Sequence, residues 1–292
     1  MEFRVLQYFL AVAREESVSG AAEYLHLSQP TLSRQLKDLE EELGKQLFIR
    51  GNRKITLTEE GMLLRKRAEE IVDLMKKTED EVSSSDETIA GNIYIGAGES
   101  AGNRILAKAA FELKQDYPDV RFHISSGNSV FVMEQLDKGL IDFGVIYGEV
   151  NHTKYDSIKL NFTDRFGVFM RKDSELAQKE FITPEDLLDK PLIVSAQEER
   201  EHWPTLGALI TDISRMNVVA TYTLFFNGSL LVEEGLGYAI CFDGLININE
   251  DSNFCFRPIL PALETTAHII WKRYQVHTKA AQKFLEKLQE QQ

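Results

Sequence analysis

The sequence predicts an α+β protein in which a helical N-terminal part, a long connecting helix and a C-terminal α/β part follow one another. Three observations predict this organisation. Amphipathic helical patterns occupy the first 45 residues, an apolar heptad repeat runs from 64 to 82, and strand and helix patterns alternate from residue 91 onward. A chain of 292 residues is long enough for about two domains. We place the boundaries at 1–58, 59–90 and 91–292.

The composition is typical of globular proteins, with 43% hydrophobic and 27% charged residues. The longest apolar run, 236–242, is far shorter than the roughly 18 residues that a membrane helix needs. The first helical pattern is interrupted by polar residues, unlike a signal peptide. Only two cysteines, Cys241 and Cys255, are present, so no disulfide framework is expected. We therefore expect a cytoplasmic protein without a membrane span, and a redox role for either thiol stays open.

The net charge of -13 argues at face value against a nucleic-acid partner, but the charge is unevenly distributed. Residues 1–58 carry eight basic and eight acidic side chains, so most of the acidity lies further along the chain. The stretch 45–54 holds Lys45, Arg50, Arg53 and Lys54 without any acidic residue. Such a local basic stretch is what a phosphate backbone attracts.

Three helices are expected in the first 45 residues. The first runs from about Glu2 to Arg14, and the second follows Ser17, a suitable N-cap, with the small residues 20–22 allowing close helix contact. Ser28 is suited to cap the third helix, whose first turn tolerates Pro30 because no N–H is required there. Apolar residues of this helix form a core stripe: Leu32, Leu36, Leu39 and Leu43. Gly44 is expected to end the helix.

The opposite face of the third helix carries Gln29, Ser33, Arg34 and Lys37. Gln and Arg side chains can make paired hydrogen bonds to base edges, and Ser and Lys side chains can reach phosphates. A helix, a short turn and a second helix with small residues at the crossing favour a DNA-recognition helix. A merely solvated helix face is the alternative.

A β-hairpin is expected next, because apolar residues at 47–49 and 55–57 flank Gly51-Asn52. Arg50, Arg53 and Lys54 would lie at its tip. This hairpin would form a wing beside the third helix, giving a winged helix-turn-helix, although a basic tip is also compatible with a solvated loop.

The connecting helix begins after Thr58, a suitable cap. Its apolar seam alternates spacings of four and three residues: Leu64, Ala68, Ile71, Met75, Thr78 and Val82. A seam of nearly three heptads requires a partner surface, most simply the same helix of a second chain. Packing against its own chain is the alternative. Residues 83–86 are polar and indicate a hinge.

The C-terminal part alternates strands with helices, which favours mostly parallel sheets. Strands are expected at 92–95, 120–125, 141–147, 158–170, 192–195, 218–223, 238–242 and 268–271, and helices at about 101–115, 128–139, from 183, 228–234 and 278–289. Gly96 and Gly98 follow a strand, but a dinucleotide fingerprint requires a third glycine at 101, which is Ala. The loops at 96–100 and 126–128 instead indicate backbone N–H groups that bind part of a small ligand.

The N-terminal sixty residues resemble the signature of LysR-type transcriptional regulators. The resemblance rests on Ala21-Ala22, Leu25, Ser28-Gln29-Pro30, Ser33, Leu39-Glu40, Leu43-Gly44, Leu47-Phe48, Arg50, Arg53, Leu57-Thr58 and Gly61. It implies base or phosphate contacts from Gln29, Pro30, Thr31, Ser33, Arg34 and Lys37, and backbone contacts from Arg50 and Arg53. It also implies a homodimer or homotetramer on double-stranded promoter DNA, with RNA polymerase as a further candidate partner.

The resemblance continues less specifically through 139–145. It implies two Rossmann-like α/β lobes similar to periplasmic solute-binding proteins, lobe I comprising 91–161 and 266–292 and lobe II comprising 162–265. A small-molecule co-inducer or co-repressor would bind between the lobes, with no other cofactor. The side chains expected to face it are Ser100, Asn128, Tyr147, Ser195 and Asn227.

Enzyme chemistry finds little support, because no metalloprotease, nucleophile-elbow or P-loop motif is present and the six histidines are scattered. The rival hypothesis is a small-molecule receptor or enzyme built on residues 87–292, with the N-terminus serving only dimerisation. The residues leave open the effector and its charge, the operator, and activation versus repression.

Overall fold

The structure, a computed structural model, describes residues 1–51, 54–83, 89–197, 207, 210 and 212–291. The chain divides into two compact units, Met1–Ser83 and Ser84–Gln292.

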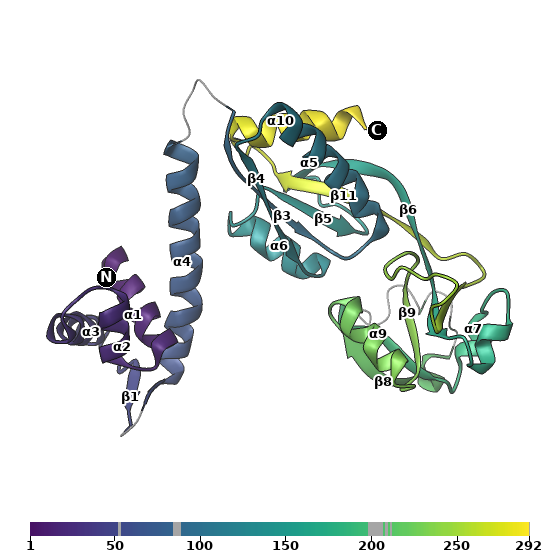
Figure 1. Cartoon of the computed structure of the whole chain (residues 1–292), viewed down its shortest axis with the longest axis horizontal. Coiled ribbons are helices and arrows are strands. Elements are labelled where there is room, and N and C mark those ends of the chain that lie inside the picture. Colours follow the sequence, from purple (N-terminus) through teal and green to yellow (C-terminus); the bar gives the residue numbers. More distant parts are fainter. Residues whose placement is uncertain (52–53, 84–88, 198–206, 208–209, 211, 292) are drawn as a thin grey trace. The chain divides into compact units, whose positions relative to one another are not determined.

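The N-terminal unit consists of helices with a small hairpin at its edge (Figure 1). Its elements are α1 (Phe3–Glu15), α2 (Val18–Tyr24), α3 (Gln29–Leu43), β1 (Phe48–Arg50), β2 (Ile55–Leu57) and α4 (Glu59–Ser83). The core joins all of them, from Phe9 of α1 to Ala68 of α4, both fully buried. The rings of Phe9 and Phe48 lie 5.1 Å apart, so the hairpin is packed onto α1.

Local hydrogen bonds set the helix ends where the sequence predicts them. The Ser17 hydroxyl accepts from the N–H of Gly20 at 3.2 Å, and the Ser28 hydroxyl accepts from the N–H of Thr31 at 3.3 Å. Gly44 ends α3 in the left-handed conformation at φ 63°. One expectation about the core stripe is wrong: Leu43 is 40% exposed, because it is the last residue of α3 and lies beyond the buried Leu39.

The apolar seam of α4 divides into two parts. Leu64 and Ala68 pack against the N-terminal core, whereas Ile71 and Met75 are each 41% exposed and Val82 is 81% exposed. Only the first part of the predicted seam is therefore covered within the N-terminal unit.

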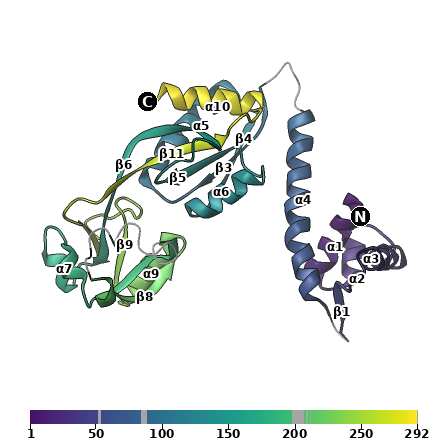
Figure 2. The same ribbon diagram turned by 180° about the vertical axis from the view of Figure 1, so that it is seen from behind.

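The C-terminal unit is built on a single sheet with helices on both faces (Figure 2). Its strands are β3 (Gly91–Ala97), β4 (Val120–Ser126), β5 (Phe143–Tyr147), β6 (Tyr155–Arg171), β7 (Pro191–Ser195), β8 (Asn217–Tyr222), β9 (Tyr238–Phe242), β10 (Phe254–Pro258) and β11 (Glu264–Lys272). Its helices are α5 (Arg104–Asp116), α6 (Ser129–Asp137), α7 (Pro184–Leu187), α9 (Phe225–Glu233) and α10 (Lys279–Glu290), with short turns of helix at η1 (Ala101–Asn103), η2 (Glu175–Gln178) and η4 (Ile213–Arg215).

The described strands follow the order β4-β3-β5-β11-β6-β9-β7-β8, with β10 paired to β6. Pairing is parallel among β3, β4 and β5 and among β7, β8 and β9. It is antiparallel wherever β6 or β11 takes part. The expectation of mostly parallel sheets therefore holds within each half and fails at the junction, where two long strands run in opposite directions from one half to the other.

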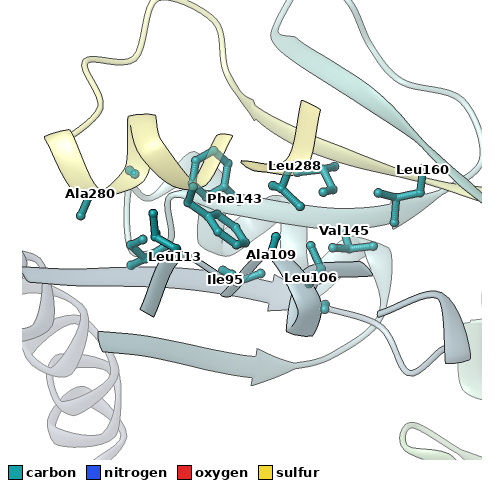
Figure 3. Close-up of a cluster of buried hydrophobic side chains, with 14 of the residues drawn as sticks. Ile95, Leu106, Ala109, Leu113, Phe143, Val145, Leu160, Ala280 and Leu288 are labelled. Atoms are coloured by element: carbon teal, nitrogen blue, oxygen red, sulfur yellow. The ribbon is translucent and has the colours of Figure 1, made fainter. Parts of the chain in front are cut away.

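We call the half with β3–β5 lobe I and the half with β7–β10 lobe II. In lobe I, α5 and α10 pack together on one face of the sheet and α6 covers the other. The core under α5 and α10 includes the fully buried Leu113, Phe143 and Phe284 (Figure 3 shows the side chains around Phe143). No helix among the described residues is both long and apolar enough to span a membrane.

Candidate functional site

The exposed face of α3 carries the polar residues singled out in the sequence. The side chains of Arg34 and Lys37 are 83% and 71% exposed, while Leu32 and Leu36 on the opposite face are buried. Gln29, Pro30 and Thr31 are exposed in the first turn, and Ser33 is half-buried. The helix therefore presents a donor-rich surface outward while its leucines fix it to the core.

The cations on this face make only exchangeable contacts. The Arg34 guanidinium lies 3.9 Å from the Asp38 carboxylate, and the Lys37 ammonium lies 3.1 Å from the Glu41 carboxylate. Each acidic partner is one helical turn further along α3. Exposed ion pairs of this kind contribute less than about 1 kcal/mol. Either cation can therefore leave its partner for a phosphate at little cost.

Hydrogen bonds fix the wing relative to α3 and α1. Glu40 of α3 accepts the N–H groups of Leu47 at 2.6 Å and Phe48 at 3.2 Å, at the start of the hairpin. Beyond α1, the backbone oxygen of Glu16 accepts from the N–H of Ile55 at 2.8 Å, and its carboxylate accepts from Lys54 at 2.9 Å. The sequence does not predict either glutamate as a positioning residue, because no local spacing reveals contacts between distant segments.

The basic residues predicted for the wing are Arg50, Arg53 and Lys54. Arg50 belongs to β1, where its backbone pairs with Ile55, but its side chain lies outside the described part of the structure. Arg53 lies outside the described residues altogether. Lys54, at the same tip, is exposed.

A cavity of about 430 Å³ lies in the C-terminal unit between the two lobes. Lobe I contributes the loops after β3 and β4, and lobe II contributes the ends of β7, β8 and β9 with the start of α9. Its aromatic lining comprises Tyr147, Phe166, Tyr222, Phe225 and Phe242. The loops lie at the carboxyl ends of parallel strands, which is where open α/β sheets bind ligands.

Three of the five expected effector contacts line this cavity, namely Asn128, Tyr147 and Ser195. Asn128 also caps α6, accepting from the N–H of Phe131 at 2.9 Å. The structure does not bring the other two to the described cavity wall. Ser100 caps η1, and Asn227 is exposed near the start of α9.

Ser100 instead belongs to a polar cluster with the buried Asp164. Its hydroxyl donates to Asp164 at 2.7 Å, and Asp164 on β6 is only 2% exposed. Burial raises the pKa of Asp164 above its ordinary value. Burial, with the nearby Asp164 carboxylate, also raises the pKa of Tyr147, whose hydroxyl belongs to the same cluster and stays protonated.

Glu99, which the sequence analysis missed, lines the cavity and connects the two lobes. Its carboxylate accepts a hydrogen bond from the N–H of Phe225, the first residue of α9. A carboxylate is stabilised at the positive end of a helix. The segment 96–100 was singled out for its glycines, its backbone N–H groups and Ser100. Glu99 was not, since its partner lies 126 residues further along the chain.

Both cysteines are buried, and burial raises the pKa of each thiol. A raised pKa keeps Cys241 and Cys255 protonated and poorly reactive. No group of three or more His, Cys, Asp or Glu residues suited to hold a metal occurs among the residues that the structure describes.

Comparison with known proteins identifies the family. Residues 3–62 match the bacterial regulatory helix-turn-helix proteins of the lysR family, and residues 86–292 match the LysR substrate binding domain. The chain belongs to the LysR family. This confirms the predicted resemblance and the α+β fold class, with an N-terminal helix-turn-helix and a C-terminal α/β domain.

Curated relatives of this LysR-family chain are transcriptional regulators. The HTH-type transcriptional regulator AlsR of Bacillus subtilis is 34% identical over 70% of this chain and 67% of its own length. The regulator BsdA of the same organism is 38% identical over 50% of each chain, so the match spans half of that relative. YfeR of Shigella flexneri is 25% identical over 95% of this chain and 90% of its own. These names confirm the prediction of a regulator rather than an enzyme.

Solved structures share the fold of the LysR-family chain over its whole length. Full-length CbnR complexed with its target DNA has a TM-score of 0.75 at 18% identity and covers 100% of both chains. A full-length point variant of OxyR from Pseudomonas aeruginosa has a TM-score of 0.58 at 22% identity, covering 100% of this chain and 99% of the other.

Proposed function

We propose that this LysR-family regulator binds promoter DNA as a homodimer or homotetramer through α3 and the wing, and that a small molecule in the cavity between the lobes modulates the binding. The exposed polar face of α3 carries this proposal. Gln29, Thr31, Ser33, Arg34 and Lys37 present donors outward from a helix that Glu40 and three buried leucines hold in place. CbnR, which shares the fold, has been crystallised with its target DNA.

The DNA contacts divide into two kinds. Gln29 and Arg34 are suited to base edges, where a good paired contact discriminates against a wrong base by about 1–3 kcal/mol. Lys37, with Arg50 and Arg53 of the wing, is suited to phosphates, which fix the register without selecting a sequence. Pro30 shapes the first turn and lies on the same exposed surface.

The exposed part of the α4 seam supports oligomerisation. Ile71, Met75 and Val82 follow the heptad spacing and stay uncovered in the N-terminal unit. Pairing with α4 of a second chain would bury them and supply two recognition helices for a two-fold related DNA site. We accordingly propose residues 1–58 as the DNA-binding domain, 59–90 as the linker and 91–292 as the effector domain, all acting in the cytoplasm, where promoter DNA lies.

The cavity supports regulation by a small molecule. Its walls come from both lobes, so a ligand there would alter the free energy of one lobe arrangement relative to another. Such a ligand changes DNA affinity only if it binds the two states differently. Asn128, Tyr147 and Ser195 offer hydrogen-bonding groups at the wall, whereas Ser100 would act indirectly through Asp164.

A mobility-shift competition with the purified protein tests the DNA assignment. The labelled probe is the region upstream of its own gene, and the competitors are the same fragment and a shuffled fragment of equal length. We expect the specific competitor to displace the probe at a concentration at least about 1,000-fold below the shuffled one. Equal displacement by both would contradict the proposal.

A further inference from the structure

We propose that the cavity between the lobes binds a small organic cation, a protonated amine with an apolar or aromatic body, and that Glu99 is the residue that holds the ammonium group. This deepens the proposed effector role and rests on it for its regulatory meaning. The binding itself is a property of the protein alone and can be tested without DNA.

Glu99 is an anchored carboxylate with remaining acceptor capacity. One oxygen, Oε2, accepts a hydrogen bond from the N–H of Phe225 at the N-terminal end of the nine-residue helix α9. Within the described part of the chain, Glu99 makes no other hydrogen bond or ion pair. A carboxylate has about four acceptor positions, so the group can receive an ammonium donor without leaving α9.

Aromatic residues from both lobes contribute to the lining of the cavity that contains Glu99. The ring centroids of Tyr147 and Phe242, which belong to different lobes, lie 5.1 Å apart, and those of Phe242 and Phe166 lie 4.5 Å apart. The ring centroids of Tyr222 and Phe225, the residue that donates to Glu99, lie 5.3 Å apart. The Tyr222 hydroxyl donates to the backbone oxygen of Ile240 at 2.7 Å, which fixes the Tyr222 ring. Aromatic faces attract cations, and their apolar surface suits a hydrocarbon body.

The charges of the described lining also favour a positively charged ligand. Its ionisable acids are Glu99 and Glu264, and it contains no Lys, Arg or His. The Arg165 guanidinium lies 3.3 Å from the Glu264 carboxylate, whereas Glu99 has no cation paired with it among the described residues, so an ammonium group is attracted more strongly to Glu99. An anionic ligand would place a second negative charge beside Glu99 without a cation in the described lining, which is costly in a partly buried site.

Calorimetric titration of the full-length protein with three probes of one skeleton tests this inference. The probes are 2-phenylethylamine as the cation, 2-phenylethanol as the neutral analogue and 3-phenylpropionate as the anion. We expect the amine to bind at least about tenfold more tightly than the alcohol, because a charge-assisted hydrogen bond is roughly twice as strong as a neutral one. We expect the anion to bind most weakly. Tighter binding of 3-phenylpropionate, or no heat from the amine up to about 10 mM, would overturn the inference.

Two variants show whether Glu99 is responsible. Glu99→Gln keeps an oxygen that can accept from Phe225, so the fold is retained, but its loss of charge should weaken amine binding about tenfold and leave the alcohol unchanged. Glu264→Gln removes the same charge from the same cavity, yet should weaken amine binding less than about threefold, because the Arg165 guanidinium beside Glu264 repels an ammonium group. If both variants lost amine affinity equally, with unchanged melting temperatures, the ammonium group would not be bound by Glu99 in particular, which would contradict the inference.

The two proposals fail separately. Amine binding with no effect on sequence-specific DNA affinity would leave the cation site intact and contradict its role as the effector site. Specific DNA binding with preference for the anionic probe would keep the regulator and overturn the cation site.

Discussion

Glu40 of α3 accepts the backbone N–H of Leu47 at 2.6 Å and thereby connects the recognition helix to the first strand of the wing. The same oxygen accepts from Phe48 at 3.2 Å. Together with the packing of Phe48 on Phe9, this carboxylate holds the start of the wing against the N-terminal helices.

Glu40→Ala should loosen the wing. It leaves two partly buried N–H groups without their acceptor, which costs about 1–3 kcal/mol in local stability. Hydrogen exchange of peptides covering 44–57 should accelerate accordingly. Glu41→Ala is the control, because Glu41 only pairs with the exposed Lys37 and its loss should leave exchange unchanged. Equal protection in wild type and Glu40→Ala would show that the wing is held by packing alone.

Ile71→Asp should abolish pairing through α4. The side chain is 41% exposed on the part of the seam that the N-terminal core leaves uncovered, and a carboxylate there would be buried in a helix pair. Light scattering should show the mass falling to half that of the wild type or less. Lys66→Asp places the same charge on the opposite face of α4 and should leave the mass unchanged. A wild-type mass for Ile71→Asp would remove α4 from the interface.

Asp164 should make stability depend on pH. Burial raises the pKa of Asp164 in the folded state. Its contribution to the free energy of unfolding is therefore fully present below the unfolded-state pKa of about 4, and it is lost as the pH rises through the folded-state pKa. Asp164→Asn keeps an acceptor for Ser100 and removes the buried charge. Thermal melts should show a higher Tm than wild type at pH 8 and no gain at pH 4. Asp156→Asn, on the same strand but half-buried, is the control and should not raise the Tm at pH 8. A Tm for Asp164→Asn below that of the wild type at pH 8 would contradict a destabilising buried charge at Asp164.

The two thiols should be inert in the folded protein. Burial raises the pKa of Cys241 and Cys255, and only the thiolate is strongly nucleophilic. Titration with a thiol reagent at pH 7.5 should detect little reaction until denaturant is added, when both cysteines of the chain react. Rapid modification of one thiol in the folded state would revive a redox role.

Local signals in the sequence predicted most of the elements, because caps and periodicity act over a few residues. Ser17, Ser28 and Gly44 set helix ends where expected. The strand β10 was missed: its five residues end in Pro258, and it pairs only with β6 among the described strands. Edge positions of this kind carry weak patterns.

The candidate sites were predicted less evenly. The face of α3 follows from helical spacing alone, so its exposed residues could be named in advance. The cavity depends on two lobes that are distant in sequence. The resemblance to the family correctly predicted that Asn128 and Tyr147 line it, but Asn227 lies outside the described lining. Glu99 could not be found, because its significance lies in a hydrogen bond to Phe225 in the other lobe.

Fluorescence anisotropy of a labelled operator duplex, titrated with protein at several salt concentrations, tests the central claim most directly. We predict that the logarithm of affinity falls linearly with the logarithm of salt concentration, and that Lys37→Ala makes this slope shallower by about one. Arg34→Ala should weaken specific binding by roughly 5- to 150-fold, corresponding to about 1–3 kcal/mol. Lys108→Ala, which removes another exposed cation, on lobe I, should change neither value. Affinity that is independent of salt and unchanged in both α3 variants would contradict DNA binding by this helix.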